Sequence, residues 1–264
     1  MRPYYDSENK RIVHLGQKSD SNYWDGHWEQ GELERQIKVK DHHFVINNTK
    51  KYLPLGSKIL EGGSGRGDKV YSLQHHGYDA TGVDYAKETV KKIKEIVPEL
   101  NITLGDVRKL DFANDHFDGY WSLGVIEHFF NGYQEIATEM YRVLKKDGYL
   151  FMTVPSMSPL RRLKSTIKQY PPFASSQEAE DQFYQFLLPH EGIIKDFEEI
   201  GFKLVQHHPY DGVKGLKDEV SFLGPLLQKC YESRSPIIKV FRKLIDITFR
   251  KFSNHMSFYV FQKK

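Results

Sequence analysis

The chain has 264 residues, of which 39% are hydrophobic and 28% are charged; this is the composition of a globular protein and excludes a disordered one. Its net charge of +3 is too small to indicate a nucleic-acid partner. No apolar run reaches the ~20 residues that a membrane-spanning helix needs, so we expect no membrane span.

The first 55 residues precede the regular part of the chain. Residues 1–30 are polar and aromatic without a sustained period, and they lack the apolar stretch of a signal peptide. Residues 31–53 carry apolar side chains at helical spacing before Pro54 and Gly56, which predicts one helix. The lack of a signal and the presence of one cysteine, Cys230, favour a cytoplasmic protein.

From Lys58 to Pro155, strand-like and helix-like segments alternate. We predict strands over Lys58–Glu61, Tyr78–Asp84, Asn101–Leu104, Phe117–Leu123 and Tyr149–Val154, and helices over Asp68–His75, Ala86–Val97 and Tyr133–Leu144. This alternation predicts a doubly wound α/β fold, in which a mostly parallel sheet carries helices on both faces.

Two long irregular stretches follow, over residues 156–190 and 208–255. Between them we predict a helix over Glu191–Ile200 and a strand over Phe202–His207, and after them a last strand over Met256–Gln262. Because both stretches leave the carboxyl ends of strands, where such sheets bind ligands, we expect both to roof a pocket.

The turn after the first strand, Glu61–Gly67, is rich in glycine. Gly63 and Gly65 let the backbone bend sharply and approach a ligand, and the amides before the next helix favour a negative group. The spacing is G-x-G-x-G, whereas a dinucleotide-binding loop needs a glycine where this chain has Asp68. The turn therefore indicates a ligand site and disfavours a nicotinamide oxidoreductase. A tight turn without a ligand is the alternative.

Two acidic residues follow the next two strands. The Asp84 carboxylate can accept hydrogen bonds from both hydroxyls of a ribose, or it can cap the following helix. Asp106 can accept a hydrogen bond from an exocyclic amine beside Val107, or it can be only a turn residue.

These motifs and two further runs, Ser122–Phe129 and Tyr141–Leu150, occur in the order of a known family. They resemble class I S-adenosylmethionine-dependent methyltransferases, most closely the small-molecule and ubiquinone-type branch. The resemblance covers residues 56–155, and it implies S-adenosyl-L-methionine as the cofactor and a seven-stranded Rossmann-like sheet whose last strand is antiparallel. In these terms residues 1–55 are an extension that covers the cofactor. Residues 56–264 are the methyltransferase domain, with cap insertions at about 156–190 and 208–255.

The resemblance also implies a role for each matched position. It places Glu61 near the cofactor's amino group, Gly63 and Gly65 along the methionine and ribose, Asp84 on the ribose hydroxyls, Tyr85, Asp106 and Val107 around the adenine, and Leu123 near the methionine. Gly62 departs from the family, which usually has an apolar residue there, and we expect looser packing at that point.

Methyl transfer from a sulfonium depends mainly on alignment and on exclusion of water, because the donor is already activated. An oxygen acceptor also needs a base. His128 is the first candidate for that base and His190 the second, while Glu127 can orient the acceptor or cap the next turn. A structural role is the alternative for His128. We expect no metal.

The acceptor is expected under the cap. The N-terminal segment with Trp24 and Trp28 resembles extensions that cover the cofactor in related enzymes. Further aromatic candidates for the wall are Tyr170, Phe173, Phe183 and Tyr184, and packing within the cap is their alternative.

Two basic stretches each allow two interpretations. Residues 161–168 either meet an anionic group of the acceptor or form a solvated helix face. Residues 237–249 carry apolar and basic side chains at helical spacing, and this helix either docks on the domain or lies on a membrane surface.

The sequence therefore predicts a methyltransferase that acts on a small-molecule acceptor, with oxygen as the acceptor atom and a sugar or glycan precursor as the acceptor class. A membrane-associated methyltransferase for a quinone or a lipid is one alternative. A partner protein that binds the cofactor without turnover is the other.

Overall fold

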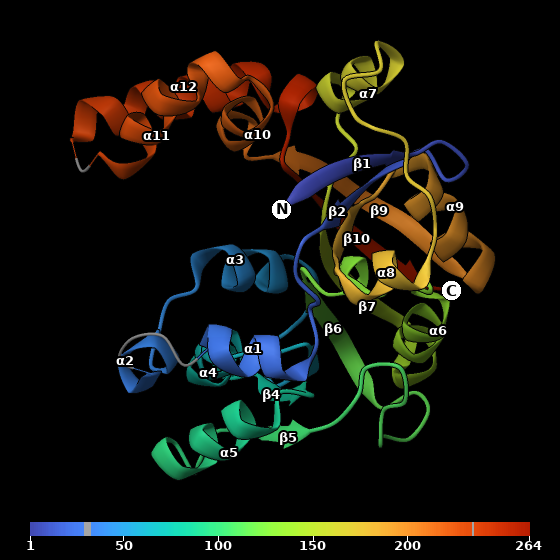
Figure 1. The fold of residues 1–264 in the computed structure, drawn as a ribbon. Helices are drawn as coiled ribbons and strands as arrows, with labels where there is room; N and C mark the ends of the chain where they lie inside the picture. The colour runs from blue at the N-terminus through green and yellow to red at the C-terminus, as the bar shows by residue number, and fades with distance from the viewer. Residues whose placement is uncertain (29–32, 234) are drawn as a thin grey trace.

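The computed structural model describes residues 1–28, 33–233 and 235–264. Its centre is a seven-stranded sheet in the order β5-β4-β3-β6-β7-β10-β9 (Figure 1). The strands are β3 (Lys58–Gly62), β4 (Asp79–Asp84), β5 (Ile102–Leu104), β6 (Phe117–Leu123), β7 (Leu144–Pro155), β9 (Phe202–Tyr210) and β10 (Met256–Lys263). The first five are parallel, and β10 is antiparallel to both β7 and β9. The predicted fold class is confirmed.

Each face of this sheet carries its own apolar core. Alternate residues of one strand serve the two cores, as Tyr120 and Trp121 do on β6. The helices of the first core are α6 (Gln134–Val143) and α9 (His190–Ile200); those of the second are α3 (His43–Tyr52), α4 (Asp68–His75) and α5 (Lys87–Ile96). The carboxyl ends of the parallel strands lie between these two helical layers, at the edge of the sheet where such folds bind ligands.

A second sheet was not predicted from the sequence. It joins the hairpin of β1 (Arg2–Asp6) and β2 (Arg11–Leu15) to β8 (Phe183–Leu187), all antiparallel. The insertion at 156–190, expected to be irregular, thus contains β8 together with α7 (Pro159–Thr166) and α8 (Gln177–Asp181). The N-terminal residues and the first insertion form one layer.

The single helix predicted over residues 31–53 is wrong. Residues 31–32 lie outside the described part of the chain, and the rest forms α2 (Leu33–Ile37) and α3. The Ser72 hydroxyl accepts a hydrogen bond from the His42 N–H (2.9 Å) and donates one to the Lys40 carbonyl (2.9 Å). These bonds hold the backbone of residues 38–42 outside a helix.

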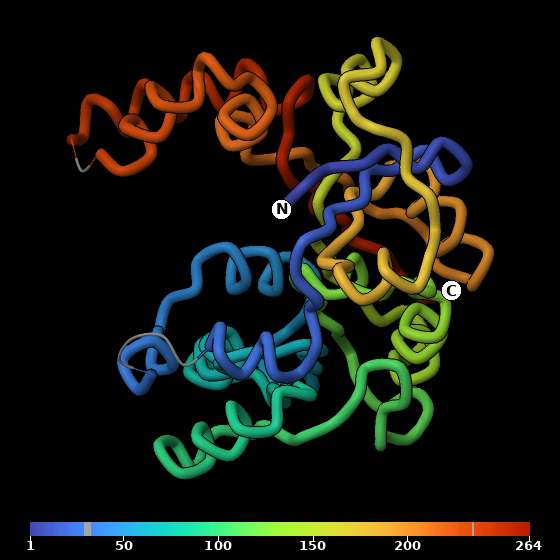
Figure 2. Tube along the Cα trace, in the orientation of Figure 1, coloured from blue at the N-terminus to red at the C-terminus, as the bar shows by residue number. Residues whose placement is uncertain are grey.

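The insertion at 208–255 forms a helical arm, which we define as α10 (Gly212–Glu219), a 3₁₀ turn (Ser221–Leu223), α11 (Gly224–Glu232) and α12 (Pro236–Ser253). In Figure 2 this arm stands apart from α1–α3 and the body below it. Within the described residues, no helix has the length and apolar character needed to cross a bilayer.

The first basic stretch is a solvated helix face only in part, because Arg162 and Lys168 are exposed whereas Lys164 is half-buried. The Arg161 side chain is buried, and its Nε lies 2.8 Å from Glu219 Oε1 on α10. Lys164 pairs with the same carboxylate at 2.6 Å, and Arg162 pairs with Glu191. Arg161 and Lys164 therefore tie α7 to the arm, and Arg162 ties it to α9 at the surface.

Candidate functional site

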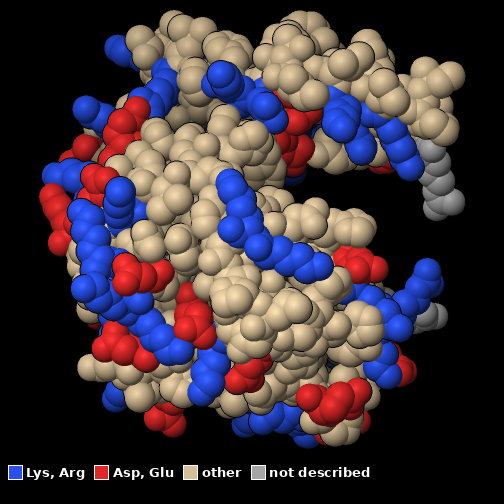
Figure 3. Space-filling model, turned by 180° about the vertical axis from the view of Figure 1, so that it is seen from behind, with Lys and Arg blue, Asp and Glu red and all other residues tan. Residues whose placement is uncertain are grey.

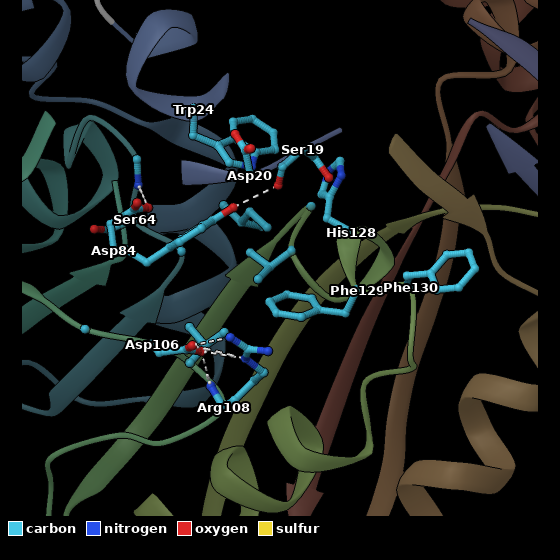
Figure 4. A pocket seen from close by; sticks show the side chains of 18 of the residues that line it. Ser19, Asp20, Trp24, Ser64, Asp84, Asp106, Arg108, His128, Phe129 and Phe130 are labelled. Atoms are coloured by element: carbon cyan, nitrogen blue, oxygen red, sulfur yellow. Dashed lines mark hydrogen bonds and ion pairs between the residues drawn. The ribbon is translucent and has the colours of Figure 1, made fainter. Parts of the chain in front are cut away.

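A cavity of about 630 Å³ lies at the carboxyl ends of β3, β4 and β6. Its volume is typical of sites that enclose a small ligand. In Figure 4, Ser64 and Asp84 lie on one side of it, His128, Phe129 and Phe130 on the other, and Trp24 and Ser19 across from Asp106 and Arg108. The eight residues predicted for cofactor binding all line this cavity: Glu61, Gly63, Gly65, Asp84, Tyr85, Asp106, Val107 and Leu123. Their roles stay predictions.

The glycine-rich turn needs glycine for two separate reasons. Gly63 and Gly65 have φ angles of +74° and +50°, in the left-handed region that side chains disfavour. A Cβ on Gly65 would also lie 2.8 Å from the Trp28 ring. The indole of Trp28 therefore packs directly on the loop backbone, where it forms part of the cavity wall.

Asp84 joins this turn to the end of β4. Its carboxylate accepts hydrogen bonds from the Gly65 N–H (2.7 Å) and the Ala86 N–H (2.9 Å). Burial raises the pKa of this carboxyl. The alternative role of capping α5 belongs to Asp25, which accepts hydrogen bonds from both the N–H and the hydroxyl of Thr89 at 2.8 Å.

The innermost end of the cavity holds polar atoms that lack a partner. Glu61 is 1% exposed, and among the described residues nothing bonds to its Oε2 or to the Ser64 hydroxyl. Burial raises the pKa of Glu61 to about 8, while the charge of Lys69 opposes this shift. A hydrogen-bond donor or a cation from a ligand would satisfy the unpartnered Oε2. An ammonium group, such as the one on an amino-acid tail, fits that requirement.

Asp106 is engaged by Arg108. The Arg108 Nη2 lies 2.6 Å from Asp106 Oδ2, and the Arg108 N–H donates to Oδ1 at 2.9 Å. The hydrogen bond from the Arg108 N–H is the one expected if Asp106 is a turn residue, which was the alternative role predicted for it. Since Arg108 also lines the cavity and lies over the Phe129 ring, an amine that binds Asp106 must share the carboxylate with this guanidinium.

His128 presents a neutral imidazole to the cavity. Its Nδ1 lies 2.7 Å from the Tyr184 carbonyl, which requires Nδ1 to carry the proton and leaves the lone pair on Nε2. Burial lowers the pKa of His128 to about 4. The ring contacts Trp24 edge to face, with centroids 5.0 Å apart. This state suits a general base, and the same hydrogen bond ties the residue structurally to β8.

The N-terminal segment closes one side of the cavity. The Tyr85 hydroxyl donates to the Ser19 carbonyl (2.9 Å), and the Ser21 hydroxyl donates to the Tyr85 carbonyl (3.1 Å). On α1 (Ser21–Trp28), the indoles of Trp24 and Trp28 stack with centroids 5.6 Å apart. These contacts hold the segment over the ends of β3 and β4.

Five predicted residues do not line the cavity: Glu127, Tyr170, Phe173, Tyr184 and His190. His190 lies toward the β10–β9 edge of the sheet, with Nδ1 3.1 Å from the Tyr259 hydroxyl and its ring stacked on His207. The Tyr170 hydroxyl donates to Glu219 (2.5 Å) at the base of the arm. The Tyr184 carbonyl accepts the hydrogen bond from His128 Nδ1. Glu127 is 1% exposed, and burial raises its pKa to about 8. For His190 the physical reason is strand order, since β9 and β10 lie beyond β7 from the cavity.

The insertion at 208–255 contributes no described residue to the cavity wall, so the expectation that it roofs the pocket is wrong. The insertion at 156–190 contributes Glu180 and Phe183. Phe173 packs against the apolar core instead.

Several lining residues were missed by the sequence analysis: Lys18, Ser19, Asp20, Lys69, Arg108, Phe129 and Phe130. Arg108, Phe129 and Phe130 directly follow residues that were predicted, so adjacency could have found them. Lys18–Asp20 lie in a segment without periodicity, where the sequence offers no signal.

Gly62 does not loosen the packing as expected. A Cβ at this position would lie 1.9 Å from the Tyr120 hydroxyl, so the tyrosine fills the space that the family gives to an apolar side chain. The Tyr120 hydroxyl is itself buried, with no hydrogen-bond partner among the described residues.

Comparisons with known proteins agree with this geometry. Residues 60–152 match the family model described as a methyltransferase domain. The chain is 24% identical over 216 residues to an S-adenosyl-L-methionine-dependent Diels-Alderase of Talaromyces variabilis, covering 74% of this chain and 73% of that protein.

Two solved structures share the fold. A structure described as a sarcosine dimethylglycine methyltransferase from Galdieria sulphuraria is similar with a TM-score of 0.55 and 14% identity, over 92% of this chain and 98% of that one. The 4+2 cyclase SpnF is similar with a TM-score of 0.58 and 12% identity, over 95% and 98% of the two chains.

Proposed function

Because this chain has the domain and the fold of a class I S-adenosyl-L-methionine-dependent methyltransferase, we propose that it methylates a small-molecule acceptor on oxygen. One observation carries the proposal. A single cavity joins the Glu61 carboxyl, whose Oε2 has no hydrogen-bond partner among the described residues, and the Asp84-bound glycine turn to an aromatic wall that contains His128. Such a cavity has room for a cofactor at its inner end and for an acceptor beside it.

The inner residues fit the cofactor by charge and by shape. We propose that Glu61 faces its amino group, that Gly63, Gly65 and Leu123 line its methionine portion, and that Asp84 accepts from its ribose hydroxyls. Tyr85, Asp106 and Val107 would frame the adenine. When bound, the cofactor supplies a methyl group on a sulfonium, which needs no further activation.

The outer residues fit a flat, largely apolar acceptor. Phe129, Phe130 and Phe183 supply an aromatic wall, which suits an aromatic ring or the apolar face of a sugar. Trp24 and Trp28, from the proposed covering extension of residues 1–55, exclude water from the same space.

His128 supplies the base that an oxygen acceptor needs. With its Nδ1 proton held by the Tyr184 carbonyl, Nε2 would take the proton from the acceptor hydroxyl, whose oxygen would receive the methyl group released by the sulfonium sulfur. The low pKa of His128 keeps the imidazole unprotonated at neutral pH. A low pKa also makes it a weak base, so phenol-like hydroxyls are favoured over sugar hydroxyls as the acceptor group.

The test combines a binding assay with a turnover assay. In calorimetric titrations, we expect S-adenosylhomocysteine to bind and nicotinamide dinucleotides not to bind. With radiolabelled S-adenosylmethionine and a panel of phenols and sugar derivatives, we expect label in a product and a loss of at least about tenfold in kcat for His128→Gln. Tighter binding of a dinucleotide, or full turnover by His128→Gln, contradicts the proposal.

The relative that is named for Diels-Alder activity motivates a second candidate, in which the bound cofactor only shapes the apolar wall and the acceptor cyclises. The aromatic wall of the cavity suits an extended apolar substrate of this kind equally well. The two candidates differ in one product. Methyl transfer forms one S-adenosylhomocysteine per turnover, whereas cyclisation forms none.

A further inference from the structure

The helix α12 leaves a continuous apolar face uncovered. Its side chains Ile237, Val240, Phe241, Leu244 and Ile247 are 80%, 61%, 56%, 58% and 49% exposed. They recur at steps of three and four residues, so they lie along one side of the helix. Of the two interpretations of residues 237–249, docking on the domain holds for the side of the helix that carries Ile245, which packs against the apolar cluster of Leu160, whereas the face described here stays exposed.

The same helix is firmly attached by its other sides. Ile245 packs against the cluster of Leu160, Val213, Leu216 and Leu227. The backbones of α10 and α12 approach closely, because a Cβ on Gly215 would lie 1.5 Å from the Ser253 carbonyl. Glu219, at the end of α10, is held by Arg161 and Lys164. The arm is a packed structure whose outer face is apolar, and loose folding does not explain that exposure.

The charged side chains of α12 are almost all positive. The helix carries five Lys or Arg and one acid, Asp246, whose carboxylate accepts a hydrogen bond from the Gly212 N–H. Lys239, Arg242 and Lys243 line a hollow of about 390 Å³ at the base of the arm. In Figure 3 the arm is largely tan, and Lys and Arg gather along the edge of the arm that faces the body of the molecule.

We propose that the apolar face of α12 docks on the surface of an anionic lipid bilayer. A helix with a wide apolar face and a basic polar face lies in the plane of the membrane interface, where apolar side chains enter the acyl boundary and cations attract anionic headgroups. The 18 residues of α12 give it a length of about 27 Å in that plane.

Charge selects this occupant over a second copy of the chain. Two copies that met through this face would bring two helices with the same excess of positive charge together, which is unfavourable. An anionic surface removes that repulsion. The inference does not depend on the proposed function, since it makes no claim about which acceptor is methylated.

The test is co-sedimentation of the full chain with vesicles of phosphatidylcholine alone or with about one-third phosphatidylglycerol. We expect sedimentation with the anionic vesicles and little with the neutral ones. The double variant Phe241→Ser/Leu244→Ser should weaken binding at least about tenfold, and Lys239→Gln/Lys243→Gln severalfold. The control Leu55→Ser/Val205→Ser removes exposed apolar side chains elsewhere and should bind as the wild type does.

Binding of S-adenosylhomocysteine by each variant confirms that the chain is folded. Failure to sediment with anionic vesicles overturns the proposal, as does binding that Phe241→Ser/Leu244→Ser leaves unchanged. A dimer in solution that this variant dissociates, without vesicle binding by the wild type, assigns the face to a second copy and also overturns it.

Discussion

The cavity and the helical arm are incomplete in opposite ways. In the cavity, buried polar atoms of Glu61 and Ser64 have no partner among the described residues. On the arm, large apolar side chains such as Ile237 and Phe241 are open to solvent. A buried polar group without a hydrogen bond and an exposed apolar face are both unfavourable, but they are relieved by different ligands. A polar, positively charged ligand group would satisfy the polar atoms of the cavity, and an apolar surface would cover the exposed side chains of the arm.

The N-terminal segment and the arm were both expected over the cavity, and only the first lies there. Asp25 caps α5, and Ser19 and Ser21 bond to Tyr85, so the segment is tied to the β4 side of the sheet. The arm leaves β9, at the far end of the strand order, and its ion pairs reach α7. The position of an added segment follows its polar partners and the strand from which it leaves.

Removal of the Asp84 carboxylate should have the largest effect on the cavity side. In Asp84→Ala, the Gly65 N–H loses its acceptor in a buried place, and the proposed ribose contact is lost as well. Two hydrogen bonds to a charged group predict a loss of affinity for S-adenosylhomocysteine on the order of 100-fold. Calorimetric titration measures this.

Asp79→Ala is the matched control, because Asp79 is an exposed acid at the opposite end of β4. It should bind S-adenosylhomocysteine as the wild type does. Wild-type affinity in Asp84→Ala would remove this carboxylate from the site and weaken the contrast between the cavity and the arm.

A pH dependence of binding tests the Glu61 carboxyl, whose Oε2 has no hydrogen-bond partner in the described part of the chain. In the free protein its pKa is about 8, so the carboxyl is protonated at neutral pH. A bound ammonium group favours the carboxylate, so binding releases a proton, and affinity rises with pH until it levels off above about pH 8. The expected slope approaches about tenfold per pH unit between pH 6 and 8.

Glu61→Gln should remove that slope, because the amide does not titrate. Titrations in two buffers of different ionisation enthalpy measure the released proton directly. A pH-independent affinity in the wild type would mean that no cation of the ligand faces Glu61.

The cap on α5 tests how firmly the N-terminal segment covers the cavity. Asp25→Ala removes the acceptor for the Thr89 N–H and hydroxyl, at a cost of about 1 kcal/mol. This weakens the contact between α1 and α5, and S-adenosylhomocysteine affinity should fall by about fivefold. Amide hydrogen exchange in α1 should become faster, whereas Lys91→Ala on the exposed side of α5 should change neither quantity. Unchanged exchange in Asp25→Ala would show that the Tyr85 hydrogen bonds and the tryptophan packing are enough to hold the segment.

The residues of the cavity were easier to predict from the sequence than the second sheet and the position of His190. Parallel strands bring their carboxyl ends to one edge of the sheet, so Glu61, Asp84 and Asp106 could be placed together from the β-α alternation alone. The β1-β2-β8 sheet could not be predicted, because Ile12 pairs with Leu187, a partner far along the chain. His190 begins α9, which packs against β9 at the far end of the sheet, and the sequence alone does not give that strand order.

The smallest effects are expected when apolar side chains are removed from the exposed face of the arm and a property other than lipid binding is measured. Phe241→Ser/Leu244→Ser removes apolar groups that are already more than half exposed, so the free energy of unfolding should change by less than about 0.5 kcal/mol per site. S-adenosylhomocysteine affinity should be unchanged, because no described residue of the arm lines the cavity.

Leu227→Ser is the matched change on the same arm, where the side chain is 6% exposed and packs against Leu160 and Val213. It should lower the free energy of unfolding by about 2–4 kcal/mol, as measured by denaturant titration. Equal destabilisation by the two variants would mean that Phe241 and Leu244 are covered within the protein in solution, because only a buried side chain loses that much on truncation.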